Sequence, residues 1–400
     1  MTDPGRRPYA LVTHSYYEED PRVRRQAEAI VASGRPVDVI SLRRSGEQPD
    51  GEVGGVQVHR IDVQRHQGAG IGTYLAEYLD FFVRAAVRLA RAHRRRHYAL
   101  VQVATLPDWL VLAAAPLRLA GVPVLIDLHE SMPDFFRSRF PGAANPLVHR
   151  GLLLAERASI AAASHAITVN EALRDRLLGL GVAAAHVSVV RNTPSLARFD
   201  PSAHAPRPFM ADGILRLVYA GALTPTYELD VAIRAVAGLR DERPDLAVHF
   251  DVYGRGDSAG DLAALAAQLG IGDRVTLHGR IPLDEVPAAI ARADIGLAPT
   301  RRDAFTDSSL STKILEYAAM RRAAVASRLP LVVRIFPDGV IATYEAGDPG
   351  DLAAAVLGLV DAPGARESAI ESAAGVVAGM SWERDAEAYL ALLDGFARDG

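Results

Sequence analysis

The feature that most constrains the fold of this sequence is a regular alternation of short apolar runs with longer amphipathic segments. The short runs have the length and composition of buried strands. Examples are residues 9–14, 37–42, 98–104 and 122–129. The segments between them, such as residues 23–33 and 73–95, carry apolar residues at helical spacing. Strands that alternate with helices predict an α/β protein with a parallel sheet covered on both faces.

The alternation is interrupted once, at residues 193–213, which are rich in Pro, Ala and Ser. Such stretches commonly separate domains, and the alternation restarts at residue 214. We therefore expect an N-terminal domain over 1–192, a linker, a C-terminal domain over 214–380 and a closing amphipathic helix over 381–400. Doubly wound sheets bind ligands beyond the carboxyl ends of their strands. Two facing units would place the site in a cleft between them.

Composition narrows the class of protein further. The chain has 400 residues, a net charge of −4 and no cysteine. Disulfides, thiolate metal sites and cysteine nucleophiles are excluded, and the mild negative charge argues against a nucleic-acid binder. The N-terminus shows no signal pattern, and no uncharged apolar run approaches ~18 residues. We expect a soluble, cytoplasmic protein.

Residues 305–327 contain the most suggestive local pattern. A run of apolar residues at helical spacing is preceded directly by four hydroxyl residues, with Leu310 among them. These are Ser308, Ser309, Ser311 and Thr312. A helix N-terminus presents free amides that favour a phosphate, Lys313 would lie in the first turn, and Glu316 follows on the same face. The order suits a nucleoside diphosphate, because the carboxylate could accept two ribose hydroxyls. The alternative is a capped helix with a surface Lys–Glu pair.

Several strand ends in the second half are followed by glycine or hydroxyl residues. Glycine allows a ligand to approach the backbone closely, and these ends share one edge of the sheet, although each glycine alone could simply form a turn. The candidates are Gly221 with Thr224, Gly254 with Arg255 and Gly256, Gly279 with Arg280, and Thr300. Neither a dinucleotide fingerprint nor a P-loop is present at these positions.

Polar groups also follow the strands of the first half, namely His14 to Asp20, Asp108, Asp127, His129, Glu130 and Asp134. A histidine beside carboxylates could position or deprotonate an acceptor hydroxyl. The alternative is a capped turn with solvent-facing acids. A metal site is disfavoured because His129 and Glu130 are adjacent and would point apart in an extended chain.

A basic stripe lies on the helix expected at residues 73–95. It consists of Arg84, Arg88, Arg91 and Arg95 at helical spacing. Such a stripe could bind an anionic membrane surface, or it could be the solvated face of a domain helix.

In the order and spacing of these segments the sequence resembles the retaining glycosyltransferases of family 4. The motifs are the opening DPRVRR, YALVQVATLPDWLVLAAAPLRLAGVPVLIDLHESMPDFF, ITVNEAL, VVRNTPS, YAGAL, DVYGRG, VTLHGRIPLDEVPAAIARADIGLAPT, KILEYAAM and SWERDAEAYL. The resemblance covers nearly the whole chain. It implies the GT-B fold, with two facing Rossmann-like domains.

The resemblance also implies roles for single residues. A UDP- or GDP-linked sugar would bind the second domain and a hydroxyl acceptor the first, without a cofactor or metal. Glu316 matches the second acid of the E-x7-E pattern, which holds the ribose, and Arg280 matches the segment against the base. The closing helix would cross back to the first domain. The catalytic candidates are Lys313, His129 and Glu130.

The sequence departs from the family pattern at the phosphates. Ser308 stands where the first acid of E-x7-E belongs, and Ala222 and Tyr227 stand where the phosphate-binding Arg and Lys are expected. The usual Gly and Pro after the helix are Arg321 and Ala323. We expect Lys313 to replace part of the missing charge. Two alternatives stay open: a nucleotide-sugar epimerase of the same fold, and a catalytically silent relative that acts as a binding or scaffold protein.

Overall fold

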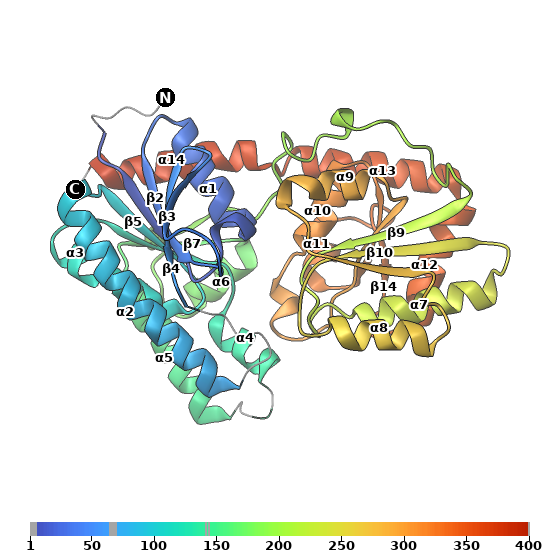
Figure 1. The fold of residues 1–400 in the computed structure, drawn as a ribbon, viewed down its shortest axis with the longest axis horizontal. Coiled ribbons are helices and arrows are strands. Elements are labelled where there is room, and N and C mark those ends of the chain that lie inside the picture. The colour runs from blue at the N-terminus through green and yellow to red at the C-terminus, as the bar shows by residue number, and fades with distance from the viewer. Residues whose placement is uncertain (1–5, 64–69, 141, 143–144, 399–400) are drawn as a thin grey trace. The chain divides into compact units, whose positions relative to one another are not determined.

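In a computed structural model the chain forms two compact units (Figure 1). Unit 1 comprises Met1–Asn192 and Glu383–Gly400, and unit 2 comprises Thr193–Trp382. The structure describes residues 6–63, 70–140, 142 and 145–398. Among these residues, no helix combines the length and the apolar character that crossing a bilayer requires.

The sheet of unit 1 contains eight strands within the described residues, in the order β3-β4-β2-β1-β5-β6-β7-β8. Their bounds are β1 Tyr9–Val12, β2 Val37–Leu42, β3 Asp50–Val53, β4 Val56–Ile61, β5 Leu100–Ala104, β6 Val124–Leu128, β7 His165–Thr168 and β8 Val187–Val189. All pairs are parallel except β3 with β4, which form an antiparallel hairpin. The hairpin turns through Gly54 and Gly55, whose φ angles of 60° and 82° suit a tight two-residue turn.

The helices of unit 1 mostly lie where the apolar spacing predicts them. They are α1 Pro21–Ala32, α2 Ile71–Arg96, α3 Ala115–Leu119, α4 Met132–Arg139, α5 Pro146–Ala162, α6 Glu171–Gly179 and α14 Trp382–Arg398. The apolar residues at 107–120 also predict one continuous helix, and this prediction is wrong, because a 3₁₀ helix, η2 (Asp108–Ala114), precedes the short α3. Pro116 explains the break, since it lacks an N–H and its ring clashes with the carbonyl four residues earlier.

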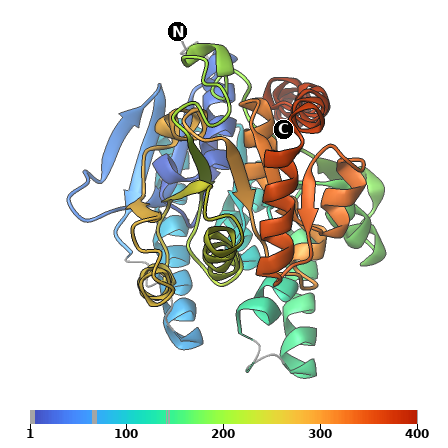
Figure 2. The ribbon, with the colours of Figure 1, turned by 90° about the vertical axis from the view of Figure 1, so that its right-hand side faces the viewer.

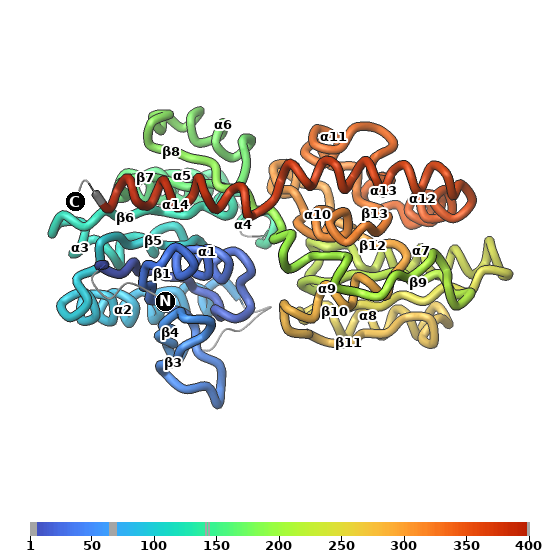
Figure 3. Tube along the Cα trace, turned by 90° about the horizontal axis from the view of Figure 1, so that it is seen from above, coloured from blue at the N-terminus to red at the C-terminus, as the bar shows by residue number. Residues whose placement is uncertain are grey.

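The closing helix α14 packs within unit 1 (Figure 3). The Tyr389 hydroxyl donates to Gln102 of β5 at 2.8 Å, and the Tyr9 hydroxyl of β1 donates to Asp394 at 2.8 Å. Tyr389 and Leu393 are fully buried. The helix is therefore part of the core of unit 1, although it is remote from the rest of that unit in sequence.

The six-stranded sheet of unit 2 is parallel throughout its described pairs and has the order β11-β10-β9-β12-β13-β14. Its strands are β9 Ile214–Ala220, β10 Ala247–Tyr253, β11 Val275–Gly279, β12 Ile295–Ala298, β13 Ala323–Ser327 and β14 Ala342–Tyr344. Its helices are α7 Leu229–Glu242, α8 Ala259–Gln268, α9 Val286–Ala291, α10 Thr312–Ala319, α11 Pro330–Ile335, α12 Pro349–Asp361 and α13 Pro363–Ala378. Two apolar clusters, one with α7 and α12 and the other with α10 and α13, hold the helices on the sheet.

In both sheets the strand order reverses at one point. In unit 1 the chain leaves β1 towards β2 and later returns to β5 on the other side, and in unit 2 the same reversal separates β9 from β12. The helices on the two sides of such a point diverge, which leaves a crevice outside the carboxyl ends of the two strands. The fold therefore marks the β1–β5 and β9–β12 strand ends as binding positions.

Candidate functional site

The helix expected after the hydroxyl residues of the 305–327 segment is present as α10, and Lys313 lies in its first turn. Hydroxyl residues at a helix start commonly cap its first amides, but that expectation is wrong here. Ser311 occupies the N-cap position, but its side chain makes no cap hydrogen bond. The hydroxyls of Ser308 and Ser309 instead donate to the Phe305 carbonyl at 3.1 and 3.2 Å. The chain before α10 forms a short 3₁₀ turn, Thr306–Ser308. The Ser308 and Ser309 hydroxyls therefore bond to the residue that precedes this turn and not to the amides of α10.

Lys313 is the chain's only lysine, and it is 7% exposed. Its Nζ lies 4.0 Å from the ring centroid of Tyr227 and 5.0 Å from that of Tyr219. No described residue gives this Nζ a hydrogen bond or an ion pair. Burial lowers the pKa of Lys313 to about 8, although the charge of Glu316 opposes the shift. The tyrosine rings supply cation–π attraction but no counter-charge.

Gly221 makes room for this lysine. A Cβ on Gly221 would lie 2.3 Å from Cε and 2.8 Å from Nζ of Lys313. Gly254 likewise has no room for a side chain, because a Cβ added there would lie 1.8 Å from the Gly221 carbonyl oxygen. The predicted close approach to these glycines is therefore made by the protein's own lysine and backbone.

The position of Lys313 follows from the topology. Gly221 directly follows β9, and α10 follows β12, so the lysine lies at the reversal point of the unit 2 sheet. Tyr227 belongs to the loop between β9 and α7. The Gly254 amide donates to Gly279 at 2.8 Å, which brings the ends of β10 and β11 to the same edge.

The remaining predicted residues of unit 2 lie around this edge with different exposure. Thr224 and Glu316 are half-buried, whereas Arg255 and Arg280 are exposed. Arg301, which follows β12 and is an alternative to Lys313 as the phosphate-binding cation, forms an ion pair with Asp303 at 3.1 Å. Leu310 and Thr312 are half-buried beside the start of α10. Lys313 is thus the buried cation among these candidates.

In unit 1 the predicted carboxylate group is built around Asp127, which is fully buried. It accepts two hydrogen bonds from Arg22, at 3.0 and 2.7 Å, and one from Gln26 at 2.8 Å. Burial alone would raise the pKa of Asp127, but Arg22 and His129 outweigh it and hold that pKa well below its usual value. The interpretation of this acid as solvent-facing is therefore wrong.

His129 lies on the same side of the chain as Asp127, and its Nε2 is 3.3 Å from the Asp127 Oδ2. Its backbone amide donates to Thr105, at the end of the neighbouring β5. Glu130 is half-buried beside it. The strand alternation thus pairs the histidine with the residue two positions earlier rather than with Glu130.

Two further groups in unit 1 are buried at strand ends. Asp108 is 2% exposed, and neither carboxylate oxygen has a hydrogen-bond partner among the described residues. Burial, with the nearby charge of Glu156, raises the pKa of Asp108 well above its usual value. His14 follows β1 at the reversal point, and its ring centroid lies 4.7 and 5.0 Å from those of Tyr78 and Phe81, with the rings nearly perpendicular. The aromatic partners of His14 come from α2, so local sequence could not have identified them.

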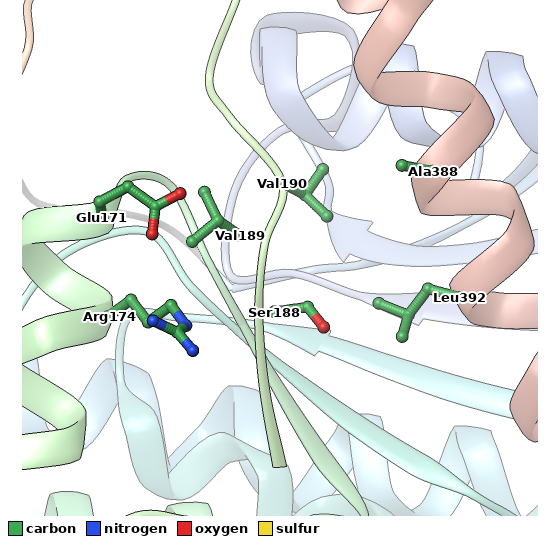
Figure 4. A pocket seen from close by; sticks show the side chains of 7 residues that line it. All are labelled: Glu171, Arg174, Ser188, Val189, Val190, Ala388 and Leu392. Atoms are coloured by element: carbon green, nitrogen blue, oxygen red, sulfur yellow. The ribbon is translucent and has the colours of Figure 1, made fainter. Parts of the chain in front are cut away.

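A cavity of about 530 Å³ lies on the outer strand of the unit 1 sheet (Figure 4). Glu171 and Arg174 line it from α6, and Ala388 and Leu392 from α14, with Ser188 and Val189 of β8 and the next residue, Val190, between them. None of the residues predicted for the site lines it. Within the described residues, no cluster of three or more histidines and acids has a geometry that could hold a metal ion.

Comparison with known proteins identifies the class. Two α/β units in one chain match the solved structure of sucrose-phosphate synthase from Thermosynechococcus elongatus, with a TM-score of 0.78, 17% identity and coverage of 99% of this chain and 100% of that chain. HepE from Anabaena, solved in complex with UDP-glucose, matches with a TM-score of 0.71 and 14% identity over 97% of this chain and 99% of that chain. At these identities the likeness shows the fold, which is GT-B.

Sequence comparison narrows the class to a family. Residues 215–362 match the family described as "Glycosyl transferases group 1", and residues 20–193 match the "Glycosyl transferase 4-like domain". The chain therefore belongs to the family 4-type glycosyltransferases.

Curated relatives match over part of their length. The D-inositol 3-phosphate glycosyltransferase of Actinosynnema mirum is 32% identical over 262 residues, which cover 62% of this chain and 61% of the relative. The alpha-D-kanosaminyltransferase of Streptomyces kanamyceticus is 25% identical over 269 residues, which cover 64% and 66%. The matched region thus spans less than two thirds of the length of these relatives.

Proposed function

We propose that the protein transfers a sugar, with retention of anomeric configuration, from a nucleotide diphosphate sugar to an acceptor hydroxyl. The single observation that carries this proposal is the state of Lys313. A buried ammonium without a hydrogen bond, whose neighbouring acid Glu316 offsets only part of the cost of burial, is costly unless a ligand completes its environment. A diphosphate at the β9–β12 reversal point would supply hydrogen bonds and further negative charge.

The donor-binding residues are those grouped at this edge of unit 2. The phosphates would meet Lys313 and the first amides of α10, which favour an anion. Glu316 would accept the ribose hydroxyls, and the backbone near Gly279 and Arg280 would contact the base. Solved neighbours of this fold include HepE bound to UDP and to UDP-glucose, which favours a UDP-linked donor.

The acceptor would bind unit 1 near the ends of β1, β5 and β6. His129, held beside Asp127, and Glu130 would position the acceptor hydroxyl. The acceptor oxygen forms its bond to the anomeric carbon on the face from which the diphosphate leaves, and its proton passes to the departing phosphate oxygen. Lys313 would stabilise the charge that grows on this phosphate, where a preorganised cation contributes most to the rate.

The names of the relatives favour a small polyol acceptor. One acts on an inositol phosphate, and another relative, from Streptomyces kanamyceticus, is a 2-deoxystreptamine glucosyltransferase that is 26% identical over 240 residues. No step of this reaction needs a metal ion, because the lysine and the helix amides supply the positive charge. Full activity in the presence of EDTA is therefore expected.

A thermal-shift screen against nucleoside diphosphates and their sugars tests the proposal. We expect stabilisation by UDP or GDP and by the corresponding sugar, and loss of that stabilisation in Lys313→Ala. Mass spectrometry after incubation with the donor alone separates transfer from epimerisation, because an epimerase converts the donor without an acceptor. If no nucleotide binds the wild type, the protein is a silent relative and the proposal is wrong.

A further inference from the structure

The outer face of α2 carries a row of exposed apolar side chains. Leu75, Leu79, Val83 and Val87 are 55%, 57%, 51% and 43% exposed. Residues four apart lie about 40° apart around a helix, so the row forms a continuous stripe about 18 Å long. The core needs only the opposite side, where Phe81, Ala85 and Leu89 are fully buried. Single exposed apolar residues are common on soluble proteins, but a contiguous row of this kind marks a contact surface.

Arginines border this apolar stripe. The helix carries Arg84, Arg88, Arg91, Arg94, Arg95 and Arg96, against the two acids Glu77 and Asp80. The whole chain has a net charge of −4, so the excess of positive charge is particular to this helix. A second copy of the chain would bring a like-charged helix against it, which disfavours self-association through the stripe.

Two arginines of the predicted basic stripe form ion pairs within the protein. Arg84 pairs with Asp80 of the same helix at 2.6 Å, and Arg88 pairs with Asp50 of β3. Both arginines are therefore partly neutralised. Among the described residues, Arg91, Arg94 and Arg95 have no ion-pair partner, and all three are exposed. The positive charge that is available to a ligand lies towards the C-terminal end of α2.

A second helix of unit 1 has a similar face. Leu147 and Leu154 of α5 are 78% and 67% exposed, and Arg150 and Arg157 lie between and beyond them on the exposed side. Figures 1 and 2 both show that the first turns of α2 and α5 extend past the strands at the same end of unit 1. The leucines nearest the starts of the two helices, Leu75 and Leu79 of α2 and Leu147 of α5, therefore lie at this end, whereas Arg91, Arg94 and Arg95 lie at the other end of α2.

We propose that unit 1 docks on an anionic lipid surface through the apolar stripe of α2, with Arg91, Arg94 and Arg95 at the headgroups and the α5 leucines as a second contact. Leucine and valine side chains enter the boundary of headgroups and acyl chains, and the arginines bind the anionic headgroups. This surface lies on unit 1 and does not include the residues around Lys313, so the proposal is independent of the proposed reaction.

Co-sedimentation with vesicles tests the docking surface directly. The wild type is mixed at low salt with vesicles of phosphatidylcholine alone or of phosphatidylcholine with phosphatidylglycerol. We expect stronger binding to the anionic vesicles, and weaker binding as salt is added, because salt screens the arginines. The double variant Leu79→Glu/Val83→Glu should bind at least about tenfold more weakly, since carboxylates enter an apolar, anionic boundary unfavourably. The double variant Arg91→Gln/Arg95→Gln should bind anionic vesicles more weakly, by about fivefold for each arginine removed.

Leu119→Glu is the matched control, because Leu119 is 90% exposed on α3, outside the stripe. It should bind vesicles as the wild type does, and circular dichroism should show all variants folded. Three results would overturn the proposal: no binding of the wild type, equal binding to neutral and anionic vesicles, or unchanged binding of the stripe variant. A dimer in gel filtration that Leu79→Glu/Val83→Glu dissociates, without vesicle binding, would assign the stripe to a protein interface and would likewise overturn it.

Discussion

The substitution Lys313→Met separates a ligand-binding cation from a structural one, because it should stabilise the free protein and weaken nucleotide binding. The pKa of Lys313 is about 8, against 10.5 for an ordinary lysine. That difference means that burial costs the charged form about 3 kcal/mol at pH 7. Cation–π attraction from the two tyrosines returns about 1–2 kcal/mol. Methionine is apolar, flexible and of similar length, so it can fill the space between the rings.

The free energy of unfolding of unit 2 should therefore rise by about 1–2 kcal/mol in Lys313→Met at pH 7, which is about 2–4 °C in melting temperature for each kcal/mol. The effect depends on pH in a definite direction. The folded-state pKa lies below the unfolded one, so the unfolded wild type binds the extra proton between about pH 8 and 10.5. The wild type gains stability as pH rises through this window. The advantage of the variant is full below pH 8 and absent above 10.5.

Thermal melts of the wild type and Lys313→Met from pH 7 to 10 measure this pH-dependent difference in stability directly. Since Lys313 is the only lysine, labelling with an amine reagent followed by peptide mass spectrometry also gives its titration and its protection by UDP or GDP. A lower melting temperature for Lys313→Met at pH 7, together with unchanged nucleotide affinity, would refute the argument. That outcome would mean that the lysine is a packing residue whose charge is satisfied within the protein.

Three further predictions concern the neighbours of this lysine and the buried carboxylate. Gly221→Ala should push the lysine out of its place and weaken nucleotide binding at least about tenfold, whereas Gly238→Ala, whose Cβ meets open space on α7, should leave binding unchanged in the same calorimetric titration. Glu316→Gln should weaken nucleotide binding about ten- to a hundredfold through loss of charge-assisted bonds to ribose, and unchanged affinity for UDP and GDP would remove Glu316 from the site. Asp127→Asn should lower the free energy of unfolding of unit 1 by about 3–5 kcal/mol, because it leaves Arg22 buried without its charge partner; chemical denaturation that gives a loss below about 1 kcal/mol would contradict this.

The fold could be predicted largely from local pattern, and the departures have local physical causes. Buried parallel strands read as continuous apolar runs, so β1, β2 and β9 were recognisable. β3 was not, because its sequence DGEV holds one apolar residue and alternates between exposed and half-buried positions. The break between η2 and α3 depends on one residue, Pro116.

The candidate site was predictable only in part, for a different reason. The first-turn position of Lys313 follows from local spacing, but its ring partners Tyr219 and Tyr227 are more than 80 residues away in sequence. Asp127 likewise meets Arg22 across 105 residues. Local sequence shows which residue types stand at the strand ends, whereas the packing of distant elements decides which of them are buried together.

Steady-state kinetics on Lys313→Ala, Arg255→Ala and Arg301→Ala, with the donor found by thermal shift, test the central claim most directly. If Lys313 is the cation that holds the leaving diphosphate, Lys313→Ala should lower kcat/KM about a hundredfold or more, with much of the loss in kcat. This corresponds to a loss of about 3 kcal/mol of transition-state stabilisation. Arg255→Ala and Arg301→Ala should have smaller effects, because Arg255 is exposed and Arg301 is already paired with Asp303. Full kcat in Lys313→Ala, with a large loss in either arginine variant, would contradict the assignment.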